Sequence, residues 1–156
     1  MEREPFGFYE FFAGGGMARL GLGNQWRCLM ANDICEKKAR SYRKNFNEAP
    51  EFICRDVTNL RLEDLPGEPA LAWASFPCQD LSLAGSEEGL NGERSGTFWP
   101  FSRLIQAMDS DGRKIPIIVL ENVVGAITSN KGRDFETLLR TLVDAGYDVG
   151  PLVIDG

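Results

Sequence analysis

Short apolar runs alternate with helical patterns along this chain, and that alternation is the strongest constraint on its fold. Runs typical of strands occupy residues 6–12, 26–31, 51–54, 71–76 and 115–120. Apolar residues recur at i, i+3, i+4 and i+7 over residues 101–108 and 135–142, with a weaker stripe over 34–46. Strands that alternate with helices pair in parallel through right-handed crossovers. The sequence therefore predicts an open, doubly wound and mostly parallel α/β sheet.

The last part of the chain predicts one more helix and one more strand. Asp134 lies where the helix over 135–142 would be capped, and Gly146 lies where it would stop. The apolar run 147–154 then predicts a sixth strand. No internal repeat, low-complexity tract or linker marks a second domain, so we expect residues 1–156 to form one part of a single domain.

Charge and composition limit the classes of function. The net charge is −6, the wrong sign for binding phosphate backbones strongly. A basic cluster over residues 37–44 is explained most simply as the solvated face of a helix. No apolar stretch approaches the roughly 20 residues that span a bilayer, and the N-terminus lacks a secretory signal, so we expect a cytoplasmic protein.

The cysteine pattern argues against a metal site. Four cysteines lie at wide spacings without a Cys-x-x-Cys pair, and the chain contains no histidine. We therefore expect no zinc or other metal site. A nucleophilic thiol in this chain would also need activation by a group other than histidine.

A glycine-rich turn follows the first predicted strand, in the stretch FFAGGGMARLGLG over residues 11–23. Glycines in such a turn let the backbone approach a ligand at the mouth of the sheet. The dinucleotide fingerprint G-x-G-x-x-G is incomplete, because Arg19 stands at the position of the third glycine after Gly14 and Gly16. Taken alone, a glycine-rich turn is more often only a turn.

Two acidic residues follow the next two predicted strands. Asp33 ends the second and Asp56 ends the third. A carboxylate at the first position can accept ribose hydroxyls, and one at the second can accept an adenine amino group, so the pair suits an adenosine. The alternative is that both residues are helix caps or turn residues, roles that Asp favours in any protein.

The fourth and fifth predicted strands end in the stretches FPCQ and LENV. Cys78 would lie at the ligand-binding edge as an exposed nucleophile, or be a small buried residue, as most lone cysteines are. Glu121 could exchange protons opposite the thiol or cap the following helix, and Asn122 lies beside it.

Together these stretches resemble the cytosine-C5 DNA methyltransferase family. Six motifs resemble those of the family and occur in its order: FFAGGG, AND, RDV, FPCQDLSLAG, RSGTF and LENV. The stretch GRDFETLLRTLVDAGYDV resembles the family's seventh region, so the resemblance spans nearly the whole chain. Three residues depart from the pattern: Glu10 replaces the usual Asp, Asp33 the usual Glu, and Thr97 a frequent Leu.

The resemblance implies a Rossmann-like, S-adenosylmethionine-dependent fold, incomplete at its C-terminus, and methyl transfer to C5 of cytosine in DNA. It gives Cys78 the role of a thiolate that adds to C6 of a flipped-out cytosine. It gives Glu121 the contacts to N3 and the exocyclic amine, and Asn122 the role of orienting that segment.

The resemblance also assigns binding residues. The cofactor contacts that it implies are Phe12, Ala13, Gly14, Gly16, Asp33, Ile34, Asp56, Val57, Pro77 and Thr97. The residues that it places at the substrate or in a closing loop over residues 82–96 are Gln79, Ser82 and Arg94.

The family's eighth motif, target-recognition domain and final helix do not occur in these residues. We therefore expect a fragment or one part of a split enzyme, with double-stranded DNA and a possible second subunit as partners, that methylates poorly alone. A non-catalytic S-adenosylmethionine-binding module is the main alternative, and RNA remains open as a substrate. A nicotinamide-binding Rossmann protein is disfavoured by the incomplete glycine fingerprint.

Overall fold

The structure, a computed structural model, describes residues 4–77 and 96–154. Its internal contacts divide the chain into two compact units. The first comprises Met1–Phe76 and Pro100–Glu121, and the second comprises Pro77–Trp99 and Asn122–Gly156.

The first unit contains a sheet of five parallel strands in the order β3-β2-β1-β4-β5. The strands are β1 (Phe6–Phe11), β2 (Trp26–Asp33), β3 (Phe52–Cys54), β4 (Leu71–Ala74) and β5 (Ile117–Leu120). All five predicted strands are confirmed, each within two residues of its expected bounds. Because the strands are parallel, their carboxyl ends share one edge, and the strand order reverses between β1 and β4. In such sheets ligands bind beyond that edge, at the point of reversal.

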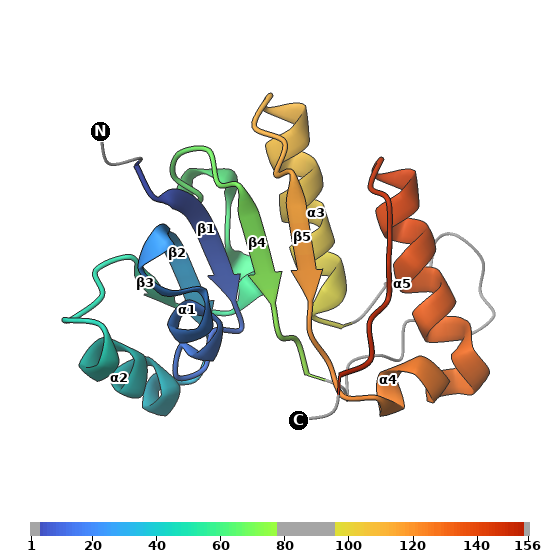
Figure 1. Ribbon diagram of the computed structural model, residues 1–156, viewed down its shortest axis with the longest axis horizontal. Coiled ribbons are helices and arrows are strands. Elements are labelled where there is room, and N and C mark those ends of the chain that lie inside the picture. The colour runs from blue at the N-terminus through green and yellow to red at the C-terminus, as the bar shows by residue number, and fades with distance from the viewer. Residues whose placement is uncertain (1–3, 78–95, 155–156) are drawn as a thin grey trace. The chain divides into compact units, whose positions relative to one another are not determined.

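Helices lie on both faces of this sheet (Figure 1). They are α1 (Met17–Leu22), α2 (Glu36–Asn45) and α3 (Phe98–Ser110). On one face Phe8 packs in a core cluster with Ala39 and Tyr42 of α2. On the other the ring of Phe11 lies 5.0 Å from that of Phe101 of α3. Alternate side chains of β1 thus enter different cores, and the doubly wound architecture is confirmed.

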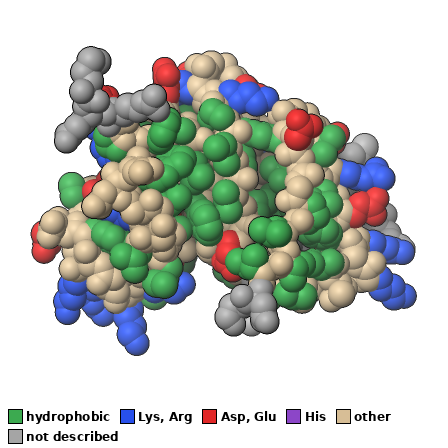
Figure 2. All heavy atoms as spheres, viewed as in Figure 1, with side chains coloured by type: hydrophobic (Ala, Val, Ile, Leu, Met, Phe, Trp, Pro, Cys, Tyr) green, Lys and Arg blue, Asp and Glu red, His purple; other side chains and the backbone are tan. Residues whose placement is uncertain are grey.

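Helix α2 explains the basic cluster of the sequence. Its apolar stripe buries Ala39 and Tyr42 against the sheet, whereas Lys37, Lys38 and Arg40 are exposed. Blue side chains accordingly gather over this helix in Figure 2. The cluster is the solvated face of an amphipathic helix, as expected.

The short 3-10 helices are η1 (Gly23–Gln25), η2 (Val57–Asn59), η3 (Leu62–Asp64) and η5 (Ser129–Gly132). The second unit contains α4 (Gly125–Thr128), η5 and α5 (Arg133–Asp144).

Asp134, near the start of α5, is 1% exposed and accepts hydrogen bonds from Ser129 Oγ at 2.7 Å and Asn130 Nδ2 at 3.4 Å. Gly132 is the N-cap residue, so Asp134 anchors the preceding turn from inside the helix.

The expected sixth strand is wrong. Residues 147–154 have no regular secondary structure, and no strand of the described residues pairs with them. Leu152, Val153 and Ile154 are 83%, 64% and 77% exposed. An apolar run becomes a strand only where a neighbour supplies a hydrogen-bonding partner, and the run alone carries no information about that partner.

Candidate cofactor and catalytic site

The glycine loop follows β1 at the carboxyl edge of the sheet. Phe12, Gly14 and Gly16 have φ angles of 56°, 56° and 88°, so the backbone turns through the left-handed region three times. The amide of Ala13 donates to Asn32 O at 2.9 Å, which holds the loop against the end of β2. A Cβ atom added at Gly14 or Gly15 would meet nothing within 4 Å. The loop therefore presents open backbone to an approaching ligand.

Asp33, at the end of β2, fixes this loop from the side. It is 4% exposed, and its Oδ2 accepts from the Gly14 amide at 3.0 Å while its Oδ1 accepts from the Cys35 amide at 2.9 Å. Lys38 Nζ lies 3.5 Å from Oδ2. Each carboxylate oxygen has a second lone pair, so Asp33 can hold the loop and still accept a ligand hydroxyl. The next residue, Ile34, is 66% exposed and leaves an apolar side chain beside the acid.

Asp56 and Val57 show fewer signs of a binding role. Asp56 Oδ1 accepts from both Thr58 N and Thr58 Oγ1 at 2.8 Å and so caps η2. These contacts match the alternative interpretation of Asp56 as a turn residue. Val57 is 4% exposed and belongs to the core, so it offers little surface to a ligand.

A cavity of about 430 Å³ opens between α1 and the sheet within the first unit. Met17, Ala18, Gly21 and Leu22 of α1 line one side, and Trp73, Ser75 and Glu121 line the other. Trp73 Nε1 donates to Ser75 Oγ at 3.0 Å, and the Glu121 amide donates to Ala74 O at 3.0 Å. The exposed Glu121 is thereby fixed directly beyond β5, at the edge where the glycine loop also lies.

The remaining predicted site residues lie in the second unit or outside the described residues. Pro77 is exposed, Asn122 Oδ1 accepts from the Val123 amide at 2.9 Å, and the buried Thr97 Oγ1 has no hydrogen-bond partner among the described residues. The residues outside the described ranges are Cys78, Gln79, Ser82 and Arg94. That Cys78 faces Glu121 stays a prediction.

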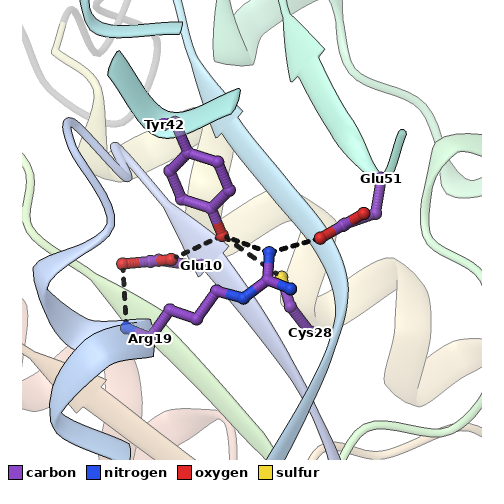
Figure 3. A network of polar contacts seen from close by, with 5 residues as sticks. All are labelled: Glu10, Arg19, Cys28, Tyr42 and Glu51. Atoms are coloured by element: carbon purple, nitrogen blue, oxygen red, sulfur yellow. Dashed lines mark hydrogen bonds and ion pairs between the residues drawn. The ribbon is translucent and has the colours of Figure 1, made fainter. Parts of the chain in front are cut away.

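A buried polar network behind the glycine loop was not predicted (Figure 3). Glu10, 1% exposed, accepts from the Arg19 amide at 3.3 Å and from the Tyr42 hydroxyl at 3.0 Å. The Arg19 guanidinium donates to Tyr42 Oη at 3.3 Å and pairs with Glu51, and Cys28 Sγ lies 3.6 Å from Tyr42 Oη. Two signals were available in the sequence: a Glu inside an apolar run, and an Arg at the third glycine position.

Burial sets the protonation behaviour of this network. Burial raises the pKa of Glu10, against hydrogen bonds from the Arg19 amide and the Tyr42 hydroxyl that lower it. Burial also raises the pKa of Cys28 to about 11, and that of Tyr42 above its usual value. The Cys28 thiol therefore stays protonated near neutral pH and is a poor nucleophile.

Protein carboxylates occupy two of the amides that a dinucleotide-binding loop would offer to a ligand. Asp33 takes the Gly14 amide, and Glu10 takes the Arg19 amide in the first turn of α1. A pyrophosphate at this helix start would approach buried negative charge instead of free N–H groups. The loop is thus suited to an adenosine-containing ligand without phosphate.

Two further structural findings concern metals and membranes. In the described part of the chain, no group of three or more Cys, Asp or Glu side chains is arranged to hold a metal ion. No helix found there has the length and apolar character to cross a membrane.

Comparison with known proteins decides the family. The sequence model for C-5 cytosine-specific DNA methylases matches residues 6–156. The chain belongs to this family. Type II methyltransferase M.BsuFI of Bacillus subtilis is 32% identical over 150 residues, which are 95% of this chain and 34% of that methylase. Type II methyltransferase M.HgiCI of Herpetosiphon aurantiacus is 34% identical over 149 residues, which are 91% of this chain and 33% of that methylase.

Solved structures agree on the fold of this DNA methylase chain. The crystal structure of S. pombe Dnmt2 methyltransferase matches with a TM-score of 0.64 at 21% identity, over 86% of this chain and 41% of that one. A Spodoptera frugiperda DNMT2 mutant matches with a TM-score of 0.60 at 22% identity, over 87% of this chain and 41% of that one. The present chain spans about a third of the length of the two curated relatives.

Proposed function

We propose that this chain is the cofactor-binding and catalytic part of a DNA cytosine-C5 methyltransferase that uses S-adenosylmethionine. The observation that carries the proposal is the pair of carboxylates, Asp33 and Glu10, bonded to the amides of Gly14 and Arg19. They leave open backbone for an adenosyl ligand, and Glu10 at the first turn of α1 disfavours a pyrophosphate there. Membership of the methylase family supports the same conclusion.

The residues of the first unit suit this cofactor in size and chemistry. When bound, S-adenosylmethionine supplies a methyl group activated by a positively charged sulfur. Asp33 would accept the ribose hydroxyls, the exposed Ile34 would lie against the adenine, and Gly14 would admit the methionine end. Both contacts of Asp56 with Thr58 use Oδ1. The other carboxylate oxygen would accept a hydrogen bond from the adenine amino group.

Cys78 and Glu121 would carry the reaction on cytosine. The Cys78 thiolate would add to C6, which makes C5 nucleophilic enough to take the methyl group of S-adenosylmethionine, with S-adenosylhomocysteine as the leaving group. Glu121, whose backbone N–H donates a hydrogen bond to Ala74 O and so holds it beyond β5, would stabilise the charge that develops at N3, and Asn122 would orient it. Loss of the C5 proton then allows elimination of the thiol, which restores both the ring and Cys78. The base must leave the duplex to reach these groups, at roughly a few kcal/mol.

DNA recognition is proposed to come largely from elsewhere. The net charge of −6 opposes strong binding of the phosphate backbone by these residues alone. We therefore propose that a further segment or a second subunit supplies the recognition surface, and that residues 1–156 alone methylate slowly.

Two assays test the proposal. Calorimetry with S-adenosylhomocysteine measures cofactor binding. Incubation with S-adenosylmethionine and an oligonucleotide containing 5-fluorocytosine traps the adduct, because fluorine at C5 blocks the final elimination. We expect a covalent adduct with the wild type and with Cys35→Ser, and none with Cys78→Ala. An adduct formed by Cys78→Ala would refute the assigned nucleophile. Cofactor binding without any adduct would instead support a non-catalytic binding module.

A further inference from the structure

The Tyr42 hydroxyl lies at the centre of the buried network of Figure 3, one layer behind the glycine loop. We propose that Tyr42 is a positioning residue for the cofactor: its hydroxyl, acting through Glu10 and Arg19, holds the glycine loop and the start of α1 in the binding conformation. This inference rests on the proposed function for its ligand, whereas its structural part concerns the free protein.

Glu10 connects Tyr42 to the first turn of α1. One carboxylate oxygen accepts from the Tyr42 hydroxyl at 3.0 Å, and the other accepts from the Arg19 amide at 3.3 Å. The N-cap residue of helix α1 is Gly16, which has no side chain to cap the free amides of the first turn. Glu10 performs that capping from β1, and Tyr42 orients Glu10.

The side chain of Tyr42 also bounds the loop directly. A Cβ added at Gly16 would lie 2.9 Å from Tyr42 Cε2 and 2.2 Å from Phe46 Cε2. From the same helix, Asn45 Nδ2 donates to Gly15 O at 3.0 Å. The end of α2 thus holds the loop at Gly15 and Gly16, and the network holds α1 beyond them.

Removing only the hydroxyl isolates the network from this packing. In Tyr42→Phe the ring stays against Gly16, but the buried Glu10 carboxylate loses one donor and the Arg19 guanidinium loses one acceptor. The Glu10 side chain is then free to turn away from the Arg19 amide, and the first turn of α1 loosens.

Tyr9 provides a matched control. It is 0% exposed, precedes Glu10 in β1, and its hydroxyl donates to Pro66 O at 2.9 Å. Because successive strand residues point to opposite faces, this hydrogen bond lies on the face of the sheet away from the network. Tyr9→Phe therefore removes one buried hydroxyl hydrogen bond without touching the glycine loop.

The test compares Tyr42→Phe with Tyr9→Phe. Both should lower the midpoint of thermal unfolding by a few degrees. Only Tyr42→Phe should accelerate amide hydrogen exchange over residues 14–19 of the free protein, and only it should raise the Kd for S-adenosylhomocysteine, roughly five- to tenfold. Calorimetry is done well below both midpoints, so that unfolding does not contribute.

The outcomes separate this inference from the proposed function. Equal exchange over residues 14–19 in both variants would refute the positioning role, whether or not the cofactor binds. Faster exchange together with a wild type that binds no S-adenosylhomocysteine would refute the proposed cofactor alone. If Tyr42→Phe does not fold, Glu10→Gln carries the same test, because it keeps the side-chain shape and weakens both hydrogen bonds.

Discussion

The three consecutive glycines of the loop should respond very differently to alanine, because their surroundings differ. At Gly15 a Cβ meets nothing within 4 Å, and φ lies outside the left-handed region. At Gly14 the space is also open, but φ is 56°. At Gly16 φ is 88°, and the new Cβ would lie 2.2 Å from the Phe46 ring.

These features give a ranked prediction for the free energy of unfolding. Gly15→Ala should leave it within about 0.5 kcal/mol of wild type, as for an open surface site. Gly14→Ala should lower the free energy of unfolding by roughly 1–2 kcal/mol, because a residue with a Cβ is strained in the left-handed backbone region. Gly16→Ala adds about 1–3 kcal/mol for overpacking, so its total loss is about 2–5 kcal/mol.

Urea unfolding followed by far-ultraviolet circular dichroism measures the series. With a slope of roughly 2 kcal/mol per molar urea, Gly16→Ala should lower the midpoint by about 1–2.5 M. Gly15→Ala is the matched control, because it adds the same methyl group one residue away. A Gly16→Ala variant no less stable than Gly14→Ala would show that the packing of Phe46 against the loop is not as described.

Two further predictions concern the acidic residues of the site. Burial raises the pKa of Glu10, so its contribution to stability is complete below the usual pKa of a glutamic acid and is lost as the pH rises through the raised value. Unfolding measured across the acidic range should therefore show a flatter pH profile for Glu10→Gln than for wild type, and an identical slope would contradict the burial effect. Asp33→Asn should weaken binding of S-adenosylhomocysteine roughly tenfold or more, because a charged acceptor that holds the Gly14 amide and the ribose is lost. Unchanged affinity in calorimetry would exclude Asp33 from the binding site.

Much of the fold could be predicted from sequence because its signals are local. The strands of a parallel sheet are buried on both faces and read as continuous apolar runs, so all five were located. The short helices α1 and α4 were missed, since four to six residues carry too little periodicity. The run 147–154 was misread, because its apolar residues are as frequent as those of a strand while the partner that a strand requires is not encoded locally.

The site was predictable only where a single position determines its role. The position of Asp33 could be predicted because it ends β2, and the structure bonds its carboxylate to the Gly14 amide; its contact with a ribose stays a prediction. The network of Glu10, Arg19 and Tyr42 spans 32 residues between Glu10 and Tyr42, and no spacing rule relates its members.

This network bears on a question that the glycine loop alone leaves open, namely which class of ligand the loop binds. A loop of this composition serves dinucleotides and adenosyl compounds equally well, and what separates them is the charge that already occupies its amides. Glu10, bonded to an amide in the first turn of α1, would repel a phosphate at that helix start, whereas a ribose and a neutral base would meet no such repulsion. We therefore propose that buried residues behind the loop help to select the ligand, together with the glycines that we expect to contact it.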